Sequence, residues 1–557
     1  MKKLFVLCLA LIGSAGIAFA NYVQVGDIEF YVEFGCKRAI AREVLNKAEV
    51  EELTIPDSVE CRGEIFPVIA IGRNFCYYSK HLKSVTIPNT VTQIREKAFY
   101  HCDSLTSINI PSSVALIGKS AFSHCESLPS INLPSSITII DEAAFSCCQS
   151  LTSVTIPESI QVISEGMFST CKNLTDVTIP NSVTTISSSA FSGCESLESI
   201  TIPLSVTEIQ KNAFNSCGLT SIYIPASVTR IAPRAFESCH NMPSITVDEN
   251  NAVYCDVDGV LFTKDKTTLV HYPAGRKGFY SIPEGTTVIG IDAFSFCNNL
   301  TDVTIPNSVT EIAESAFFRC TELHSVHIPD SVTTIGEDVF AHCFNLTDVT
   351  LPRYITAIPE GMFTDCKNLT AIEIPSNVTR IGSSAFYECI NLQSINLPSG
   401  ITDIEENAFY WCKSLTSITM PNSVKSIGEG AFQACSALTT IKWSKNLTDI
   451  APWAFASCGE LKSITLPKSI TDIKLGTFYG CRSLTTVKIP SGIQTIGPGA
   501  FKYCRELESI TIPKTVTNID IEAFFECTKL KSVTLPKNVT IGENAFTGCP
   551  DPKLIYK

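Results

Sequence analysis

The sequence predicts a β-rich solenoid with little helix, in which one stack of about twenty turns replaces the three or four globular domains that the length would otherwise allow. A unit of 23 residues recurs along most of the 557-residue chain, and apolar and polar residues alternate within it as they do in a strand. No segment keeps the 3.6-residue period of a helix. Because one such turn cannot bury its own apolar face, stacked turns are expected to share a continuous core.

The first twenty residues have the pattern of a secretory signal peptide. Met1–Lys3 is basic, Leu4–Ile12 is apolar, and Ala18–Ala20 forms a small-x-small cleavage signal. The apolar stretch is too short to span a membrane, and no other segment approaches the ~18 apolar residues of a transmembrane helix. We therefore expect cleavage after Ala20 and a secreted or cell-surface product, with no membrane insertion once the signal has been removed.

An N-terminal cap with a degenerate first repeat is expected over residues 21–81, because the segment before Val50 is irregular and the register is imperfect up to Leu82. Repeats then form a first block over 82–246 and a second block over 277–557, which ends in a partial strand. The unit reads approximately L-T-S-I-T-I-P-x-S-V-T-x-I-G-x-x-A-F-x-x-C-x-x. It begins at Leu82, Leu105, Leu128, Leu151, Leu174, Leu197, Leu219 and Met242, and again at Leu300, Leu323, Leu346, Leu369, Leu392, Leu415, Leu438, Leu461, Leu484, Leu507 and Leu530.

Each place in the unit has a physical reason. Places 1, 4 and 6 point inward along a short strand, as in Leu151–Ile156, and Pro157 ends that strand because it has no N–H to donate. Ile160 and Ile163 mark a second short extended stretch. The Ala-Phe pair supplies a bulky core wedge, and the cysteine supplies a small apolar plug.

A glycine follows the second stretch in many copies, and we expect it to form a turn with positive φ. It stands at positions Gly118, Gly336, Gly382 and Gly428.

Residues 247–276 interrupt the repeat and are predicted to form a β-hairpin insertion. Val260–Phe262 and Thr268–Tyr272 flank Lys264–Lys266, as two strands flank a turn. Asp256–Gly259 faintly resembles a calcium loop, but the carboxylate that closes such a loop is missing, and a hairpin turn explains the segment better.

The repeat resembles that of the BspA-like leucine-rich repeat family of bacterial surface antigens. One copy runs Ile179-Pro180, Val183–Ile186 and Ala190–Leu197, and the resemblance extends over residues 50–554. It implies a right-handed leucine-rich repeat superhelix with a parallel concave sheet and short convex extended segments. It also implies a secreted or surface protein, some relatives of which are adhesins for host matrix proteins or other cells.

Nineteen of the 25 cysteines share one place in the repeat, and none forms a C-x-x-C pair. We expect buried thiols that act as small apolar side chains. The alternative is a set of disulfides between neighbouring turns, whose Cα atoms would lie ~5 Å apart. Cys36 and Cys61 in the cap are the better candidates for a disulfide, and Cys147 is a candidate for a reactive thiol.

No catalytic or metal-binding motif stands in a fitting context, so we expect neither an enzyme nor a cofactor or metal site. His101, His124 and His342 are interpreted as solvated loop residues. With 42 Lys and Arg against 55 Asp and Glu, the net charge of -13 disfavours a nucleic-acid partner.

The solvent side of the predicted concave sheet is the candidate binding surface. Places 3 and 5 are usually Ser, Asp, Thr or Asn, which simple strand propensity and solubility largely explain. The acidic, aromatic and basic side chains at these places are the candidate binding residues, because such groups carry interface energy disproportionately. They are Asp176, Tyr223, Asp302, His327, Asp348, Glu373, Lys442 and Lys488.

The leading hypothesis is a protein that binds a host matrix or other cell-surface protein through this sheet, in adhesion. The alternative is a glycan-binding or cell-envelope structural protein without catalytic activity. A surface that orders ice or crystals through regular threonine rows is a third hypothesis, and solenoid curvature argues against it.

Overall fold

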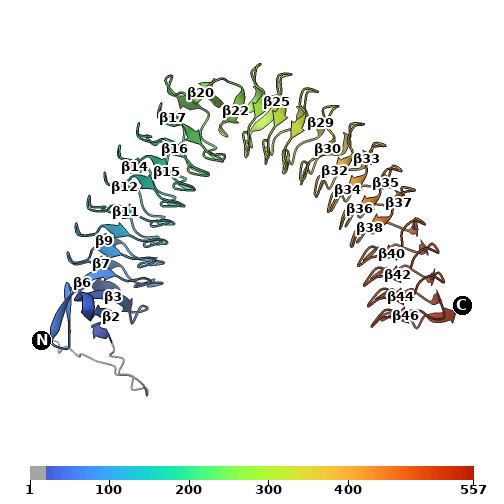
Figure 1. Ribbon diagram of the computed structural model, residues 1–557, viewed down its shortest axis with the longest axis horizontal. Coiled ribbons are helices and arrows are strands. Elements are labelled where there is room, and N and C mark those ends of the chain that lie inside the picture. The colour runs from blue at the N-terminus through green and yellow to red at the C-terminus, as the bar shows by residue number, and fades with distance from the viewer. Residues whose placement is uncertain (1–20) are drawn as a thin grey trace. The chain divides into compact units, whose positions relative to one another are not determined.

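The computed structural model describes residues 21–557, so the predicted signal peptide lies outside the described residues. The fold is a β-solenoid of about 21 turns with almost no helix, which confirms the predicted fold class (Figure 1). The chain forms two compact units. Of the described residues, the first unit comprises 21–265 and Tyr272–Arg276, and the second comprises Lys266–His271 and Lys277–Lys557.

The N-terminal segment of the first unit is a small sheet that adjoins the first turns. Strands β1, β2 and β3 are antiparallel, β3 pairs in parallel with β6, and β6 pairs in parallel with the first short strand of the repeats. Phe30, Val32 and Phe66 are buried in this segment. Its elements are β1 (Tyr22–Val25), β2 (Ile28–Glu33), the 3-10 turn η1 (Phe34–Cys36), β3 (Arg38–Val44), β5 (Ser58–Cys61) and β6 (Glu64–Ile71).

Most turns of the solenoid carry a first strand near places 3 to 5 of the repeat, and we call these strands row A. In the first unit they are β4 (Glu52–Thr54), β7 (Ser84–Thr86), β9 (Ser107–Asn109), β12 (Ser153–Thr155), β14 (Asp176–Thr178), β17 (Ile222–Ile224) and β19 (Ile245–Val247). In the second unit they are β23 (Gly278–Ser281), β25 (Leu300–Thr304), β27 (Ser325–His327), β29 (Asp348–Thr350), β31 (Ala371–Glu373), β33 (Ser394–Asn396), β35 (Ser417–Thr419), β37 (Thr440–Lys442), β39 (Ser463–Thr465), β41 (Thr486–Lys488), β43 (Ser509–Thr511), β45 (Ser532–Leu535) and β47 (Lys553–Tyr556).

A second, shorter strand follows the proline in most turns, and we call these strands row B. In the first unit they are β8 (Gln93–Ile94), β10 (Leu116–Ile117), β11 (Ile139–Ile140), β13 (Val162–Ile163), β15 (Thr185–Ile186), β16 (Glu208–Ile209) and β18 (Arg230–Ile231). In the second unit they are β22 (Thr268–His271), β24 (Val288–Ile289), β26 (Glu311–Ile312), β28 (Thr334–Ile335), β30 (Ala357–Ile358), β32 (Arg380–Ile381), β34 (Asp403–Ile404), β36 (Ser426–Ile427), β38 (Asp449–Ile450), β40 (Asp472–Ile473), β42 (Thr495–Ile496), β44 (Asn518–Ile519) and β46 (Thr540–Ile541).

Both rows pair in parallel with the neighbouring turns, as the repeat predicts. In β12, Ser153 and Thr155 are exposed while Val154 between them is buried, so the alternation of the sequence is the alternation of the two faces. Row A is interrupted more often than row B. Among the described residues its widest continuous sheet is β23-β25-β27-β29, whereas several other row A sheets contain only two strands.

The Ala-Phe segment forms a third ladder, which the sequence analysis did not predict. The backbone is left-handed twice in each turn, as at Ser120 (φ 54°) and His124 (φ 62°). Between these two residues, the N–H of Phe122 donates to the carbonyl of Ala144 in the next turn at 2.8 Å. The sequence suggests that this segment is a loop, but backbone hydrogen bonds hold it to the same segment of the next turn.

The phenylalanines of this ladder stack on one another, and the cysteines beside them are buried. The ring centroids of Phe122 and Phe145 lie 5.4 Å apart, with their planes at 5°. The thiol of Cys125 donates to the carbonyl of Phe99 in the preceding turn at 3.2 Å, and the same contact recurs along both units. Burial raises the pKa of the Cys125 thiol well above its usual range, so it stays protonated and donates. The buried-thiol interpretation is confirmed at this position.

The repeat glycine has a different role from the predicted one, because its φ is not positive. At Gly118, a Cβ atom would lie 2.7 Å from the backbone nitrogen of Glu96 in the preceding turn, and at Gly382 it would lie 2.8 Å from that of Glu360. This glycine is therefore needed for close approach between turns. The left-handed conformation occurs two residues later, at Ser120 and Ser384.

The insertion contains an antiparallel hairpin of β20 (Tyr254–Val257) and β21 (Val260–Thr263). Its turn is formed by Asp258 (φ 51°) and Gly259 (φ 75°), which confirms the hairpin-turn interpretation of this segment. The carboxylate of Asp258 accepts a hydrogen bond from Arg276 at 2.9 Å, which fixes the turn.

The possible disulfide between Cys36 and Cys61 stays a prediction. Cys36 is an exposed cysteine in η1, whereas Cys61 is buried at the end of β5. The two thiols therefore lie in different environments.

Candidate functional site

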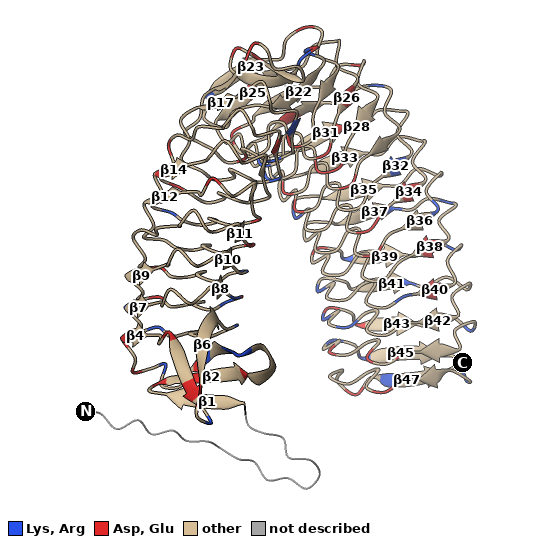
Figure 2. Cartoon of the chain, turned by 60° about the vertical axis from the view of Figure 1, so that its left-hand side comes forward, with Lys and Arg blue, Asp and Glu red and all other residues tan. Residues whose placement is uncertain are grey.

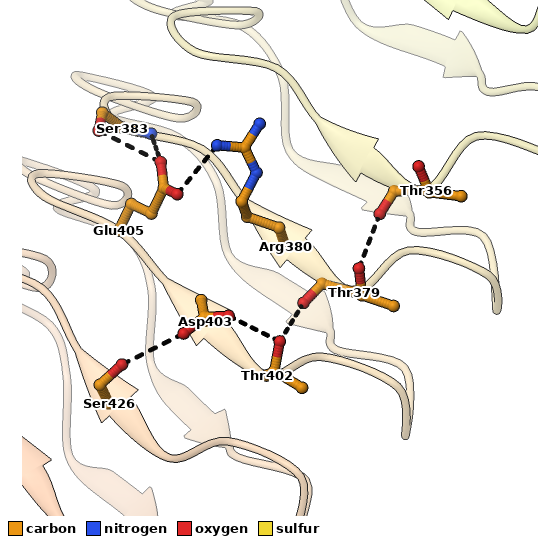
Figure 3. A network of polar contacts seen from close by, with 8 residues as sticks. All are labelled: Thr356, Thr379, Arg380, Ser383, Thr402, Asp403, Glu405 and Ser426. Carbon is orange, nitrogen blue, oxygen red and sulfur yellow. Dashed lines mark hydrogen bonds and ion pairs between the residues drawn. The ribbon is translucent and has the colours of Figure 1, made fainter.

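The threonine hydroxyls that recur at the same place in successive turns form hydrogen bonds within the fold itself. In row B, the Thr379 hydroxyl donates to the carbonyl of Thr356 at 3.2 Å, and the Thr402 hydroxyl lies 3.1 Å from the carbonyl of Thr379 (Figure 3). The Thr175 hydroxyl makes the equivalent contact at the start of a row A strand. Because these hydroxyls already bond to the backbone of the preceding turn, the rows offer less to a ligand than their composition suggests.

Charged side chains beside these rows are often paired between turns as well. Glu405 accepts hydrogen bonds from Arg380 at 3.0 Å and from the backbone N–H of Ser383 at 3.0 Å (Figure 3). Acidic and basic residues are spread over the turns of both units (Figure 2). The groups most available for recognition are therefore those that depart from the repeat and remain exposed.

The eight predicted binding residues all lie on row A strands but do not form one cluster. Asp176 on β14 and Tyr223 on β17 belong to the first unit, where the Tyr223 hydroxyl donates to Asp248 at 2.6 Å. This hydrogen bond raises the pKa of Tyr223 and lowers that of Asp248. Lys442 and Lys488 lie in separate two-stranded sheets of the second unit.

The other four residues share one region of the second unit. Asp302 pairs with Ser325, which pairs with Asp348, so the two aspartates lie in one column across β25, β27 and β29. His327 lies in the neighbouring column of the same sheet. Glu373 follows on β31, in the next turn.

Sequence reasoning missed an aromatic residue at the head of the aspartate column. Phe279 on β23 pairs in register with Asp302, and 62% of its surface is exposed. The usual residue at this place is Ser or Asp, so the departure from the repeat was the signal that could have found it. We call Phe279, Asp302, His327, Asp348 and Glu373 the acidic face.

No lysine or arginine lies on strands β23, β25, β27, β29 or β31. The arginine that follows β29, Arg353, is held by Asp330 through its backbone N–H at 2.8 Å and its Nε at 2.7 Å. This pairing lowers the pKa of Asp330 and occupies the guanidinium. The acidic face therefore offers the carboxylates of Asp302 and Asp348 and an exposed ring on the widest row A sheet among the described residues, with Glu373 on the separate sheet that β31 begins.

The edge of the solenoid beside the ladder cysteines is rich in aromatic rings, which sequence reasoning also missed. The rings of His101 and His124 stack with centroids 4.0 Å apart, and Tyr78 stacks on His101 at 4.5 Å. Burial and then the charge of His101 lower the pKa of His124. His342 contacts Asp365 through Nδ1 at 3.1 Å. These histidines are packed edge residues and not simply solvated ones.

Comparison with known proteins agrees with this architecture. A family model described as the BspA type leucine rich repeat region matches residues 69–192, 163–256, 279–390, 356–475 and 449–555. No curated protein matches the chain. Within residues 21–557, no helix is long and apolar enough to cross a membrane.

Several solved structures are similar to the chain. A leucine-rich cell surface protein of Faecalibacterium prausnitzii is 33% identical, over 76% of this chain and 94% of that one, with a TM-score of 0.49. A leucine-rich repeat protein of Bacteroides ovatus is 20% identical over 96% and 99% of the two chains, with a TM-score of 0.40. The pneumococcal vaccine antigen PcpA is 18% identical over 97% and 99%, with a TM-score of 0.30.

Proposed function

The chain belongs to the BspA-type leucine-rich repeat family. From this we propose that it is a secreted or cell-surface protein whose role is adhesion, and that it binds a protein partner through the acidic face. Leucine-rich repeat proteins generally mediate protein binding and are typically not catalysts. Export is supported by the signal-peptide pattern of residues 1–20. The similar protein of Faecalibacterium prausnitzii is described as a cell surface protein, which agrees with this location.

The observation that carries the proposal is the exposed ring of Phe279 in register with Asp302. Aromatic anchors supply a large share of binding energy at interfaces, and surrounding polar groups set specificity. Since Asp302, Asp348 and Glu373 give the face one sign of charge, the partner that fits is a segment with lysine or arginine beside an apolar side chain. Charge complementarity of this kind speeds association and weakens as salt rises.

The test is binding of the mature chain to immobilised host matrix proteins and to intact cells, compared between variants. We expect Phe279→Ser and the double variant Asp302→Lys/Asp348→Lys each to weaken binding at least tenfold. Serine is native at the place of Phe279 in other turns, so the fold should tolerate it. Asp176→Lys is the matched control, because Asp176 occupies the same place on β14 in the first unit. Equal binding by wild type and by both acidic-face variants would sink the proposal.

The alternative is a glycan-binding protein, and one feature of the second unit favours it. A hollow at the edge of that unit is lined by two tyrosines and by two arginines that form no ion pair with any described residue. Binding of polysaccharide by a chain that captures no protein would make this alternative the better description.

A further inference from the structure

The second unit has a hollow of about 400 Å³ at the edge formed by the segments around the ladder cysteines. Four successive turns line it, and its volume is large enough for one small ligand, such as a single unit of a polymer. Ser436, Ser457, Gly459 and Gly480 contribute small residues. At the same places in neighbouring turns stand large side chains, such as Trp411 and Lys413, so the small residues open the hollow.

Two tyrosines form its aromatic walls. The ring centroids of Tyr479 and Tyr503 lie 5.4 Å apart, with the planes at 89°. Trp453 packs against Tyr479 at 5.4 Å, and Phe525 packs against Tyr503 at 6.0 Å. Because each tyrosine is held by a second ring, the walls are set before any ligand arrives.

Two arginines line the same hollow. Arg482 and Arg505 are exposed, and among the described residues neither forms an ion pair. The guanidinium carbon of Arg505 lies 5.7 Å from the ring centroid of Tyr503, which orients it over the aromatic wall. Neighbouring cations on this edge are already satisfied, since Lys502 pairs with Glu522 at 2.7 Å and Lys529 with Glu506 at 2.6 Å.

These features select a class of ligand. Two guanidinium forks suit a carboxylate, which arginine binds with paired hydrogen bonds. Flat tyrosine rings suit the C–H face of a pyranose, and the serine hydroxyls suit its hydroxyl rim. We propose that the hollow binds a sugar residue that carries a carboxylate, as in a polymer of hexuronic acid. The site is separate from the acidic face, so either proposal can fail alone.

The test is titration calorimetry of the mature full chain with oligomers of galacturonic acid. A sulfated oligosaccharide from heparin and neutral dextran serve as comparison ligands. We expect saturable binding of the uronate oligomer, little binding of dextran, and about tenfold weaker uronate binding for each of Arg482→Ala and Arg505→Ala. Arg505→Lys should restore only part of the loss, because lysine lacks the planar fork.

A blocking variant separates loss of charge from loss of shape. In Gly459→Phe the new Cβ would meet only the carbonyl of Ser436, at 3.7 Å, and Phe344 occupies the same repeat place natively. We expect this variant to abolish uronate binding with its fold and its charge unchanged. Lys413→Ala removes a cation from the same repeat place outside the hollow and should leave binding unchanged.

Three results would each overturn the inference. The first is no saturable uronate binding by the wild type at millimolar concentration. The second is unchanged binding by Gly459→Phe. The third is an affinity that rises with the sulfate density of the ligand and falls equally in Lys413→Ala and Arg505→Ala. That result would indicate general charge attraction and no specific binding at the hollow. We expect Gly459→Phe to keep its adhesion to matrix proteins, because that binding is proposed to depend on the acidic face and not on the hollow.

Discussion

Removal of one ring from the phenylalanine ladder should destabilise the second unit locally. Phe409 is fully buried, and its centroid lies 5.3 Å from that of Phe386 and 5.1 Å from that of Phe432. Backbone hydrogen bonds of 2.8 Å from Phe386 and Phe409 to the next turns hold the spacing, so the cavity left by Phe409→Ala cannot collapse. We therefore expect a cost near the upper end of the usual ~3–5 kcal/mol for such a truncation.

The end of the ladder provides the control. Phe546 is only partly buried and, among the described residues, stacks on one ring alone, that of Phe524 at 5.4 Å, so Phe546→Ala should cost roughly 1–2 kcal/mol. Hydrogen exchange read by mass spectrometry should show faster exchange for Phe409→Ala in the turns from Phe386 to Phe432, and unchanged exchange in the first unit. Uniformly faster exchange in both units, or equal costs for the two variants, would refute this reasoning.

Three further predictions concern thiols, pH and glycine. Iodoacetamide should modify the half-buried Cys147 in the native protein but reach Cys389 only after unfolding, and native labelling of Cys389 would contradict the buried ladder. Burial lowers the pKa of His271 to about 4, below the ~6.5 of the unfolded chain, so the stability present above pH 6.5 should fall by about 3 kcal/mol as the pH drops to 4. Urea unfolding of wild type and His271→Leu at both pH values checks this, because the variant should lose that part of the pH dependence. Gly382→Ala should cost about 1–3 kcal/mol in thermal or urea unfolding because of backbone contact, and more than Gly459→Ala, because φ is positive at neither glycine and the Cβ at Gly459 would have no contact closer than 3.7 Å; the reverse order would contradict the close-approach role.

Periodic features of the sequence predicted the fold well. Strand alternation around Val154 and the proline that ends the strand are local, and the 23-residue register carries them from turn to turn. The role of Gly382 was predicted wrongly because backbone approach between turns depends on residues 22 to 24 positions away. The left-handed residues Ser120 and His124 gave no signal, since neither residue type demands positive φ.

The candidate site was predicted only in part. Asp302 and Asp348 were found because they stand at places that point outward, and the register of the sheet then brings them into one column. Phe279 was missed because the repeat is irregular just after the insertion. The hollow at Tyr503 was missed because it depends on small residues such as Gly459, whose importance shows only when four turns are stacked.

Crosslinking from the acidic face on intact cells tests the proposed function most directly. A photo-crosslinking amino acid placed at Phe279 should capture a distinct protein, and the same group at Ser463, an exposed residue at the same repeat place on β39, should not. Addition of salt should weaken the capture, because the acidic face attracts a basic segment. The same product from both positions, or capture from Ser463 alone, would contradict binding through the acidic face.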